Sequence, residues 1–400
     1  MRKILFLVID GLGDEKIPFL KNKTPLESAK TKNLDFLASN GLLGLVFPYK
    51  RKKQPPTSED CHLALFGYHP EKENPQRGVL EALGVNLKLK KNDIVLRGNF
   101  ATLGEDFKIV DRRAGRIEET GKLIESLKKV KIKGIKIILK KCFGHRLVLV
   151  LRGKGLSPKI EGGDPKKENV YPLKFKAKVK KAEKTAKILN EFLLKSYFIL
   201  KNHPLNKKRE KEGKKPANFI LLRGIGRPKK VKSFYEKYKL KAGAIAGGTL
   251  YKGIARFLGM KLLKVKGATG TIKTNLENKF SVAKKALSKY DFVFLHIKAT
   301  DNLAEDGNFL GKKKFIEKID KAMKKILKLK NLVICVTSDH STCSLKKSHC
   351  SLLNPILIWR DDFKKISKKV KFSENSCKKG ELGKLKQKEV LKKVIEIAKK

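Results

Sequence analysis

The sequence predicts an α/β fold in which helices cover both faces of a doubly wound sheet. Three short apolar runs support this prediction: Ile4 to Ile9, Phe292 to Ile297 and Leu332 to Val336. Each run is bounded by polar residues and is rich in β-branched or aromatic side chains, a pattern typical of a strand that is buried on both faces. Each is also soon followed by an aspartate, and ligands in such folds collect outside the carboxyl ends of the strands.

The residues that follow these runs are suited to hold metal ions. Asp10 comes directly after the first run, Asp301 shortly after the second, and Asp339 and His340 after the third, with His349 beyond a polar turn. Carboxylate oxygen and imidazole nitrogen suit Mn²⁺, Mg²⁺ or Zn²⁺. A single aspartate after a strand is more often a cap, but three beside two histidines favour a metal site at one sheet edge.

Composition bounds the class of protein. The 400 residues are 40% hydrophobic, which is enough for a sizeable core, and 95 Lys and Arg against 39 Asp and Glu give a net charge of +56. The basic residues lie in short runs without interleaved stacking aromatics, so we expect solvated faces and no specific nucleic-acid partner. No apolar run reaches the ~20 residues that span a bilayer. Six cysteines without a CxxC pair favour a reducing, cytoplasmic location.

The first third of the chain contains two helix starts. Thr24-Pro25-Leu26-Glu27 is a capping box with proline at the first helical position. A strand is expected at Leu42 to Phe47, and after Pro55-Pro56 we expect Ser58 to be the N-cap of a helix. Capping is the simpler interpretation of Ser58. A helix amino terminus also favours the binding of phosphate. Beside a metal cluster, the Ser58 hydroxyl could therefore act as a nucleophile.

Four motifs stand out along the chain: Asp10-Gly-Leu-Gly13, Ser58-Glu-Asp-Cys-His62, His296-Ile-Lys-Ala-Thr-Asp301 and Ser338-Asp-His-Ser-Thr342. Together they resemble the archaeal type of cofactor-independent phosphoglycerate mutases, within the alkaline phosphatase superfamily. Further blocks extend the resemblance over nearly the whole chain, and their order and spacing make it specific. The resemblance implies an alkaline-phosphatase-like sheet. It also implies an enzyme of glycolysis and gluconeogenesis that interconverts 3-phosphoglycerate and 2-phosphoglycerate through a phosphoserine intermediate.

The resemblance also implies roles for individual residues. One divalent ion would be held by Asp10, Ser58, Asp339 and His340, and a second by Asp301, position 305 and His349. We expect Mn²⁺ or Mg²⁺, with Zn²⁺ or Co²⁺ as alternatives. Ser58 would accept the phosphoryl group, and Lys252 stands where a phosphate-contacting lysine is expected.

The residues from 89 to 229 are expected to form an inserted, smaller α+β domain that binds substrate, between core segments 1–88 and 230–400. Short, lysine-flanked strands are predicted at Ile135 to Leu139, Leu147 to Leu151 and Phe219 to Leu222, and an exposed loop at Lys207 to Lys215. Arginine forks bind carboxylate and phosphate in a bidentate manner, although one or two of these arginines could instead form internal salt bridges. The expected substrate-binding residues are Asn99, Arg112, Arg113, Arg116 and Arg223, and Asp111 is the candidate for proton transfer.

The chain departs from the family pattern at its second metal site. Glu305 occupies the place of an expected ligand histidine, and on a helical turn it would share a face with Asp301. An added carboxylate would favour Mn²⁺ or Mg²⁺ over Zn²⁺ or Co²⁺. Three functions stay open: the mutase, a related metal-dependent phosphohydrolase or phosphotransferase, and a basic binding protein on a decayed enzyme scaffold. The oligomeric state is left open.

Overall fold

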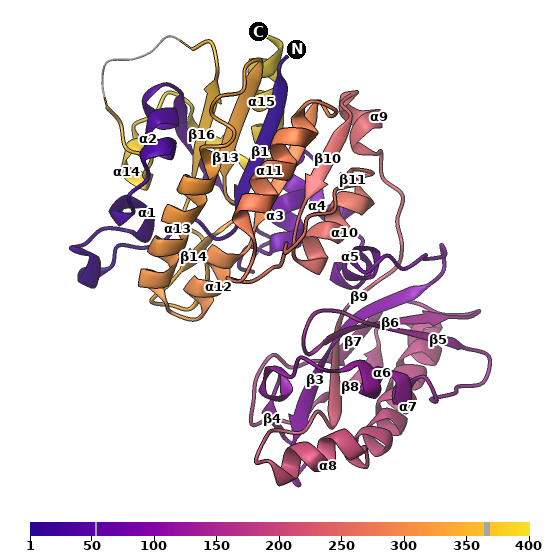
Figure 1. Ribbon diagram of the computed structural model, residues 1–400. Helices are drawn as coiled ribbons and strands as arrows, with labels where there is room; N and C mark the ends of the chain where they lie inside the picture. Colours follow the sequence, from indigo (N-terminus) through magenta and orange to yellow (C-terminus); the bar gives the residue numbers. More distant parts are fainter. Residues whose placement is uncertain (53, 364–368) are drawn as a thin grey trace. The chain divides into compact units, whose positions relative to one another are not determined.

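A computed structural model describes residues 1–52, 54–363 and 369–400 of the chain. The chain forms two compact units, one of residues 1–74 and 231–400 and the other of residues 75–230. Figure 1 shows the elements of both units along the sequence.

The first unit is built on an eight-stranded sheet with the order β11-β10-β12-β1-β13-β16-β2-β17. The central strands β10, β12, β1 and β13 are parallel, whereas β16 runs antiparallel to both β13 and β2. The strands of this unit are β1 (Lys3–Ile9), β2 (Leu42–Phe47), β10 (Ala242–Ile245), β11 (Lys261–Leu262), β12 (Phe292–Ile297), β13 (Leu332–Thr337), β14 (Ser341–Cys343), β15 (Ser348–Cys350), β16 (Asn354–Arg360) and β17 (Gly383–Lys386).

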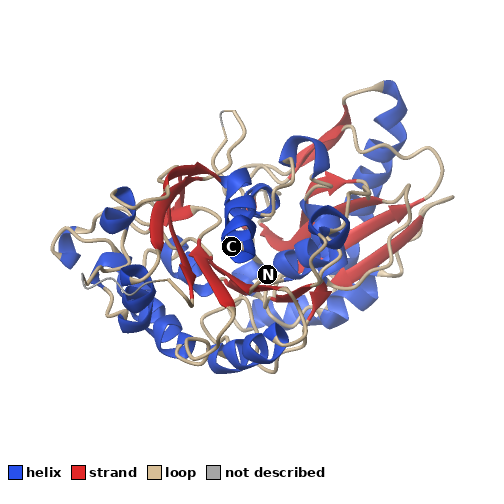
Figure 2. Ribbon diagram, turned by 90° about the horizontal axis from the view of Figure 1, so that it is seen from above, coloured by secondary structure: helices blue, strands red, loops and turns tan. Residues whose placement is uncertain are grey.

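Helices cover both faces of this sheet, as Figure 2 shows with helices in blue and strands in red. Alternate residues of β1 point to opposite faces. Leu5 and Leu7 belong to the apolar core beneath α11 and α13. Phe6 lies on the other face, where its ring centroid is 5.8 Å from that of Phe66 at the end of α3. The helices are α1 (Pro25–Ser28), α2 (Lys32–Ser39), α3 (Ser58–Leu65), α4 (Pro70–Glu73), α9 (Phe234–Tyr238), α10 (Thr249–Phe257), α11 (Leu276–Leu287), α12 (Ala299–Glu305), α13 (Phe309–Met323), α14 (Glu374–Lys378) and α15 (Val390–Lys399). The predicted α/β fold with helices on both faces is confirmed.

The second unit has a five-stranded antiparallel sheet, in which β4, β3, β6 and β5 follow one another and β9 also pairs with β3. Helices α6 and α7 pack on one apolar cluster of this sheet, and α5 packs on another through Val79 and Ala82. Its elements are α5 (Arg77–Gly84), β3 (Ile94–Leu103), β4 (Ile109–Asp111), α6 (Gly121–Leu127), β5 (Lys136–Lys141), β6 (Arg146–Arg152), β7 (Ile160–Gly163), β8 (Leu173–Ala177), α7 (Glu183–Lys201), α8 (Pro204–Lys211) and β9 (Phe219–Gly226).

One local expectation differs from the structure. The stretch Lys207 to Lys215 is not wholly a loop, because Pro204 starts α8, which continues to Lys211. The domain boundaries 89 and 229 stay a prediction, and α5, which lies before residue 89, packs on β3 and β9. No helix of the described residues is long and apolar enough to cross a membrane.

Candidate active site

The three predicted strand ends converge at one edge of the large sheet. β1 pairs with β12 on one side and with β13 on the other, all parallel, so Asp10, Asp301 and Asp339 emerge from neighbouring strands. Gly11 permits the close approach of these segments. Its φ is +65°, and a Cβ there would lie 2.5 Å from the Thr342 Oγ1 and 2.9 Å from the Asp301 Cα.

His340 Nε2 lies close to the oxygen atoms of three other expected ligands. It lies 3.2 Å from Ser58 Oγ, 3.2 Å from Asp339 Oδ2 and 3.7 Å from Asp10 Oδ1, and all four side chains are buried. The structure therefore brings together the four residues expected at the first metal site.

Ser58 is not the N-cap of its helix. Thr57 has the extended backbone of an N-cap and its side chain accepts a hydrogen bond from the Asp60 backbone N–H, so Ser58 is the first residue of α3. The expectation that Ser58 caps the helix is wrong, because the chain turns one residue earlier. The hydroxyl of Ser58 is instead directed towards His340.

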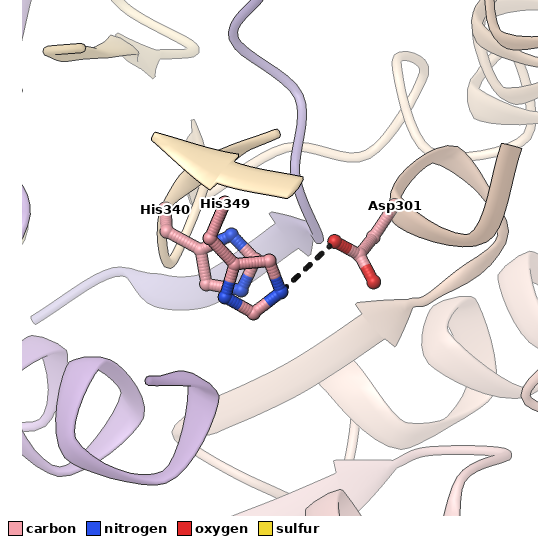
Figure 3. A group of neighbouring side chains, drawn as sticks. All are labelled: Asp301, His340 and His349. Carbon is pink, nitrogen blue, oxygen red and sulfur yellow. Dashed lines mark ion pairs between the residues drawn. The ribbon is translucent and has the colours of Figure 1, made fainter. Parts of the chain in front are cut away.

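A second group consists of Asp301, His340 and His349, which Figure 3 shows in close-up. His349 Nε2 lies 3.5 Å from Asp301 Oδ1, and the two imidazole rings stack with their centroids 3.7 Å apart. Burial lowers the pKa of His349, but hydrogen bonding and charge attraction to Asp301 outweigh it and raise the pKa to about 9. Burial of the His340 ring, together with charge repulsion from His349, lowers the pKa of His340 to about 3.

The charge balance of the cluster fits divalent cations. Asp10, Asp301 and Asp339 are fully buried, and burial together with the Asp10 charge raises the pKa of Asp339 well above 3.8. Among the described residues, Asp339 Oδ2 has no hydrogen-bond partner although it is buried. Asp10, Asp339 and His340 each offer a ligand atom, and these atoms lie within 4.8 Å of one another. A buried carboxylate oxygen that lacks a partner, with other ligand atoms at this spacing, suits a divalent metal ion.

Lys298 is the cation that the sequence analysis did not identify as part of the site. Its ammonium pairs with Asp10 Oδ1 at 3.3 Å and with Asp301 Oδ2. Burial acts to raise the pKa of both aspartates, but Lys298 and the neighbouring histidines together outweigh it and hold the pKa values below 3.8. Lys298 lies within the motif that ends at Asp301, but lysine is not a usual metal ligand, so the motif alone does not indicate its role.

Two histidines from the same motifs form the wall behind the aspartates. His296 Nε2 lies 3.1 Å from Asp10 Oδ2, and its ring stacks on Tyr251 of α10 with centroids 3.5 Å apart. His62 Nδ1 lies 2.8 Å from the Ser58 carbonyl oxygen and 3.4 Å from Asp339 Oδ2. Both rings are buried, which lowers the pKa of His296 to about 4 and that of His62 to about 3, so neutral imidazoles orient these carboxylates.

Comparison with known proteins assigns the chain to a family. The family model described as 2,3-bisphosphoglycerate-independent phosphoglycerate mutase matches residues 38–206. A protein of Methanocaldococcus jannaschii with that name is 40% identical over 99% of this chain and 97% of its own length. One from Archaeoglobus fulgidus is 42% identical over 95% of this chain and 94% of its own. The chain belongs to the 2,3-bisphosphoglycerate-independent phosphoglycerate mutase family.

Solved structures agree with this family assignment. The cofactor-independent phosphoglycerate mutase of Thermoplasma acidophilum superposes with a TM-score of 0.67 and 32% identity, covering 100% of both chains. A Pyrococcus horikoshii protein superposes with a TM-score of 0.84 and 34% identity, covering 100% of this chain and 97% of its own. The mutase family predicted from the motifs is confirmed, and with it the class of enzyme.

Glu305, the departure from the mutase family's expected pattern, ends α12, the helix that also carries Asp301. Its Oε1 lies 3.9 Å from His349 Nε2, and its side chain is 46% exposed. Glu305 is therefore beside the second ligand group but at its solvent side.

The substrate residues expected from the mutase family lie in the second unit, apart from Lys252. Arg112 forms a bidentate pair with Asp164, at 3.1 and 2.7 Å, and Arg223 lies 3.1 Å from the same carboxylate. Arg112 and Arg223 thus form internal ion pairs. Arg113 and Arg116 are exposed, and buried Asn99 donates weakly to the Arg112 carbonyl oxygen at 3.4 Å.

Asp111 and Lys252 have contrasting environments. Burial acts to raise the pKa of Asp111, but hydrogen bonds from the Arg113 and Gly115 backbone and from Lys215 lower it overall. Lys252 is half-buried on α10, directly after Tyr251, and burial lowers its pKa.

A disulfide joins Cys343 and Cys350 across β14 and β15, the hairpin that carries His349. The cysteine spacing gave no sign of this bond, because only the pairing of the two short strands brings the sulfurs together. The cytoplasmic location stays a prediction.

Proposed function

We propose that this protein interconverts 3-phosphoglycerate and 2-phosphoglycerate and that Ser58 carries the phosphoryl group between the two positions. The observation that carries the proposal is the buried Ser58 hydroxyl, 3.2 Å from His340 Nε2 in a cluster of three aspartates. Membership of the mutase family supports the same reaction.

The proposed ligands of the first ion are Asp10, Ser58, Asp339 and His340. The proposed ligands of the second ion are Asp301, Glu305 and His349. Mn²⁺ or Mg²⁺ are the favoured ions, because carboxylates dominate the donor set, and Zn²⁺ or Co²⁺ are the alternatives. When bound, such ions lower the pKa of a hydroxyl and neutralise charge on a transferring phosphoryl group.

Glu305 is proposed to complete the second ligand group. Its carboxylate is close to His349 and lies on the same helix as Asp301, which supports the assignment.

The proposed substrate contacts are made by arginines, an amide and a lysine. Arg112 and Arg223 are held in fixed orientations by Asp164, which supports a preformed fork for the substrate carboxylate. Arg113, Arg116 and Asn99 would add donors from the same unit. Lys252, with its lowered pKa, is proposed to contact phosphate.

The proposed cycle balances bonds and protons. Ser58 reacts as the alkoxide after its proton has passed to water, so the bond between Ser58 Oγ and phosphorus forms as the bond between the C3 oxygen and phosphorus breaks. The C3 oxygen needs one proton when its bond to phosphorus breaks, and the C2 hydroxyl gives one up when its oxygen attacks the phosphoserine. Asp111, which is ionised because its pKa is lowered, is proposed to accept the C2 proton and pass it to the C3 oxygen, so that the carboxylate is regenerated.

The test is an enolase-coupled assay on 3-phosphoglycerate with Mn²⁺ and without 2,3-bisphosphoglycerate. The parent should turn over, and Ser58→Ala should not. Thr57→Ala is the matched control, because it removes the N-cap of the same helix at a cost of about 1 kcal/mol and leaves the hydroxyl of Ser58 in place. Turnover in Ser58→Ala would end the nucleophile assignment, and release of free phosphate in place of 2-phosphoglycerate would instead indicate a phosphohydrolase.

A further inference from the structure

Lys312 is a fully buried lysine on α13, outside the set of expected site residues. Its ammonium donates to Asp14 Oδ2 at 2.8 Å, to the Thr342 carbonyl oxygen at 3.0 Å and to the Gly13 carbonyl oxygen at 3.2 Å. An ammonium has three N–H donors, so all of its hydrogen-bonding capacity is used.

Asp14, the carboxylate partner of Lys312, is saturated as well. Its Oδ1 accepts from the backbone N–H of Ser344 at 2.9 Å and of Glu15 at 2.8 Å, and its Oδ2 accepts from Ser344 Oγ at 2.5 Å in addition to Lys312. A buried ion pair is tolerated only when such additional hydrogen bonds satisfy it. The pair therefore has one defined geometry.

This ion pair joins two segments that carry ligands of the first expected ion. Gly13 and Asp14 belong to the loop that follows Asp10, and Thr342 belongs to β14, directly after His340. The Thr342 N–H donates to the Gly13 carbonyl oxygen at 3.0 Å. The two segments are thus tied to each other and both are tied to α13.

Thr342 transmits this arrangement to the second ligand group. Its hydroxyl donates to Asp301 Oδ1 at 2.6 Å, and this is the same oxygen that lies 3.5 Å from His349 Nε2. A shift of the Thr342 backbone would therefore turn the Asp301 carboxylate. Groups that orient metal ligands in this way commonly change metal affinity 10- to 100-fold when they are removed.

We propose that Lys312 is a positioning residue for divalent-cation binding, which acts by fixing the Thr342 and Gly13 carbonyls so that Thr342 holds the Asp301 carboxylate in its binding orientation. This rests on the proposed function in one respect only, that Asp301 and Asp10 hold cations. Lys312 itself contacts neither cation nor substrate in this scheme.

The test measures Mn²⁺ binding directly, by titration calorimetry and by the electron paramagnetic resonance signal of free Mn²⁺. Lys312→Met should weaken binding at one of two sites by at least about ten-fold. Ile319→Ala, a fully buried change on the same helix, is the matched control. It should lower thermal stability and leave Mn²⁺ affinity unchanged.

The double variant Asp14→Asn with Lys312→Met separates positioning from charge compensation. It leaves no unpaired buried charge, so it should fold even if Lys312→Met alone does not. Its Mn²⁺ affinity should stay at least about ten-fold below that of the parent, because no ammonium reaches the Thr342 carbonyl. Parent-like affinity in a folded Lys312→Met protein, or its recovery in the double variant, would overturn the proposal.

The proposed function and the positioning role fail in different ways. A parent that binds two Mn²⁺ but does not turn over 3-phosphoglycerate contradicts the mutase, and a weakened Lys312→Met still supports the positioning role. A parent that binds no Mn²⁺ overturns the positioning role.

Discussion

Replacing Lys298 by methionine tests the charge balance of the site. The Lys298 ammonium pairs with Asp10 and Asp301, and both carboxylates are fully buried while the lysine side chain is 18% exposed. Because the pKa values of both aspartates lie below 3.8, their ionised forms add stability above pH 3.8 that is lost as the pH falls through the lowered values. Lys298→Met removes this contribution at neutral pH.

The expected magnitude follows from the geometry. Removing one partner of a buried ion pair costs about 3–5 kcal/mol, which for a unit of this size lowers the unfolding midpoint by roughly 6–20 °C. The same substitution that lowers stability should strengthen metal binding. A divalent cation no longer meets the repulsion of an ammonium, so we expect at least about ten-fold tighter Mn²⁺ binding, which is about 1.4 kcal/mol.

The assay is differential scanning calorimetry of Lys298→Met with EDTA and with Mn²⁺. Lys279→Met is the matched control, because Lys279 is a fully buried lysine that donates to the His296 carbonyl oxygen and forms no ion pair with a carboxylate of the described residues. Burial, together with Lys252, lowers the pKa of Lys279 to about 8, so its loss should cost little. An unchanged midpoint for metal-free Lys298→Met, or an equal loss in both variants, would refute the reasoning.

Three further predictions concern other parts of the first unit. Cys350→Ser removes the bond to Cys343 and should lower stability by about 2.5 kcal/mol by loop-closure entropy, and calorimetry of the parent with and without dithiothreitol should show the same loss. Burial raises the pKa of Glu374 to about 7, against 4.5 ordinarily, so stability should fall as the pH rises from 4.5 to 7. Glu374→Gln should flatten that dependence, and parallel pH profiles of the unfolding midpoint would contradict it. Glu305→Ala should bind one Mn²⁺ in place of two, and two ions bound with unchanged affinity would show that Glu305 is no ligand.

The strands that build the site could be predicted because their signals are local. β1, β12 and β13 are short apolar runs, and the aspartate after each is read directly from the sequence. Parallel pairing of the three then places Asp10, Asp301 and Asp339 at one edge without further information.

The parts that escaped prediction depend on tertiary neighbours. The N-cap lies at Thr57 because of how the preceding chain turns, and both residues are good caps. Lys298 and Lys312 look like other lysines in a chain that has many, and only the buried carboxylates facing them distinguish them. The expectation that no nucleic acid is bound specifically stays a prediction.

The most direct test of the account is acid quenching of the enzyme during turnover of 3-phosphoglycerate with Mn²⁺, followed by phosphopeptide mapping. The account predicts phosphate on Ser58, present in the parent and in Thr57→Ala and absent from Ser58→Ala. Phosphate on another residue, or turnover of Ser58→Ala at the parent rate, would contradict it.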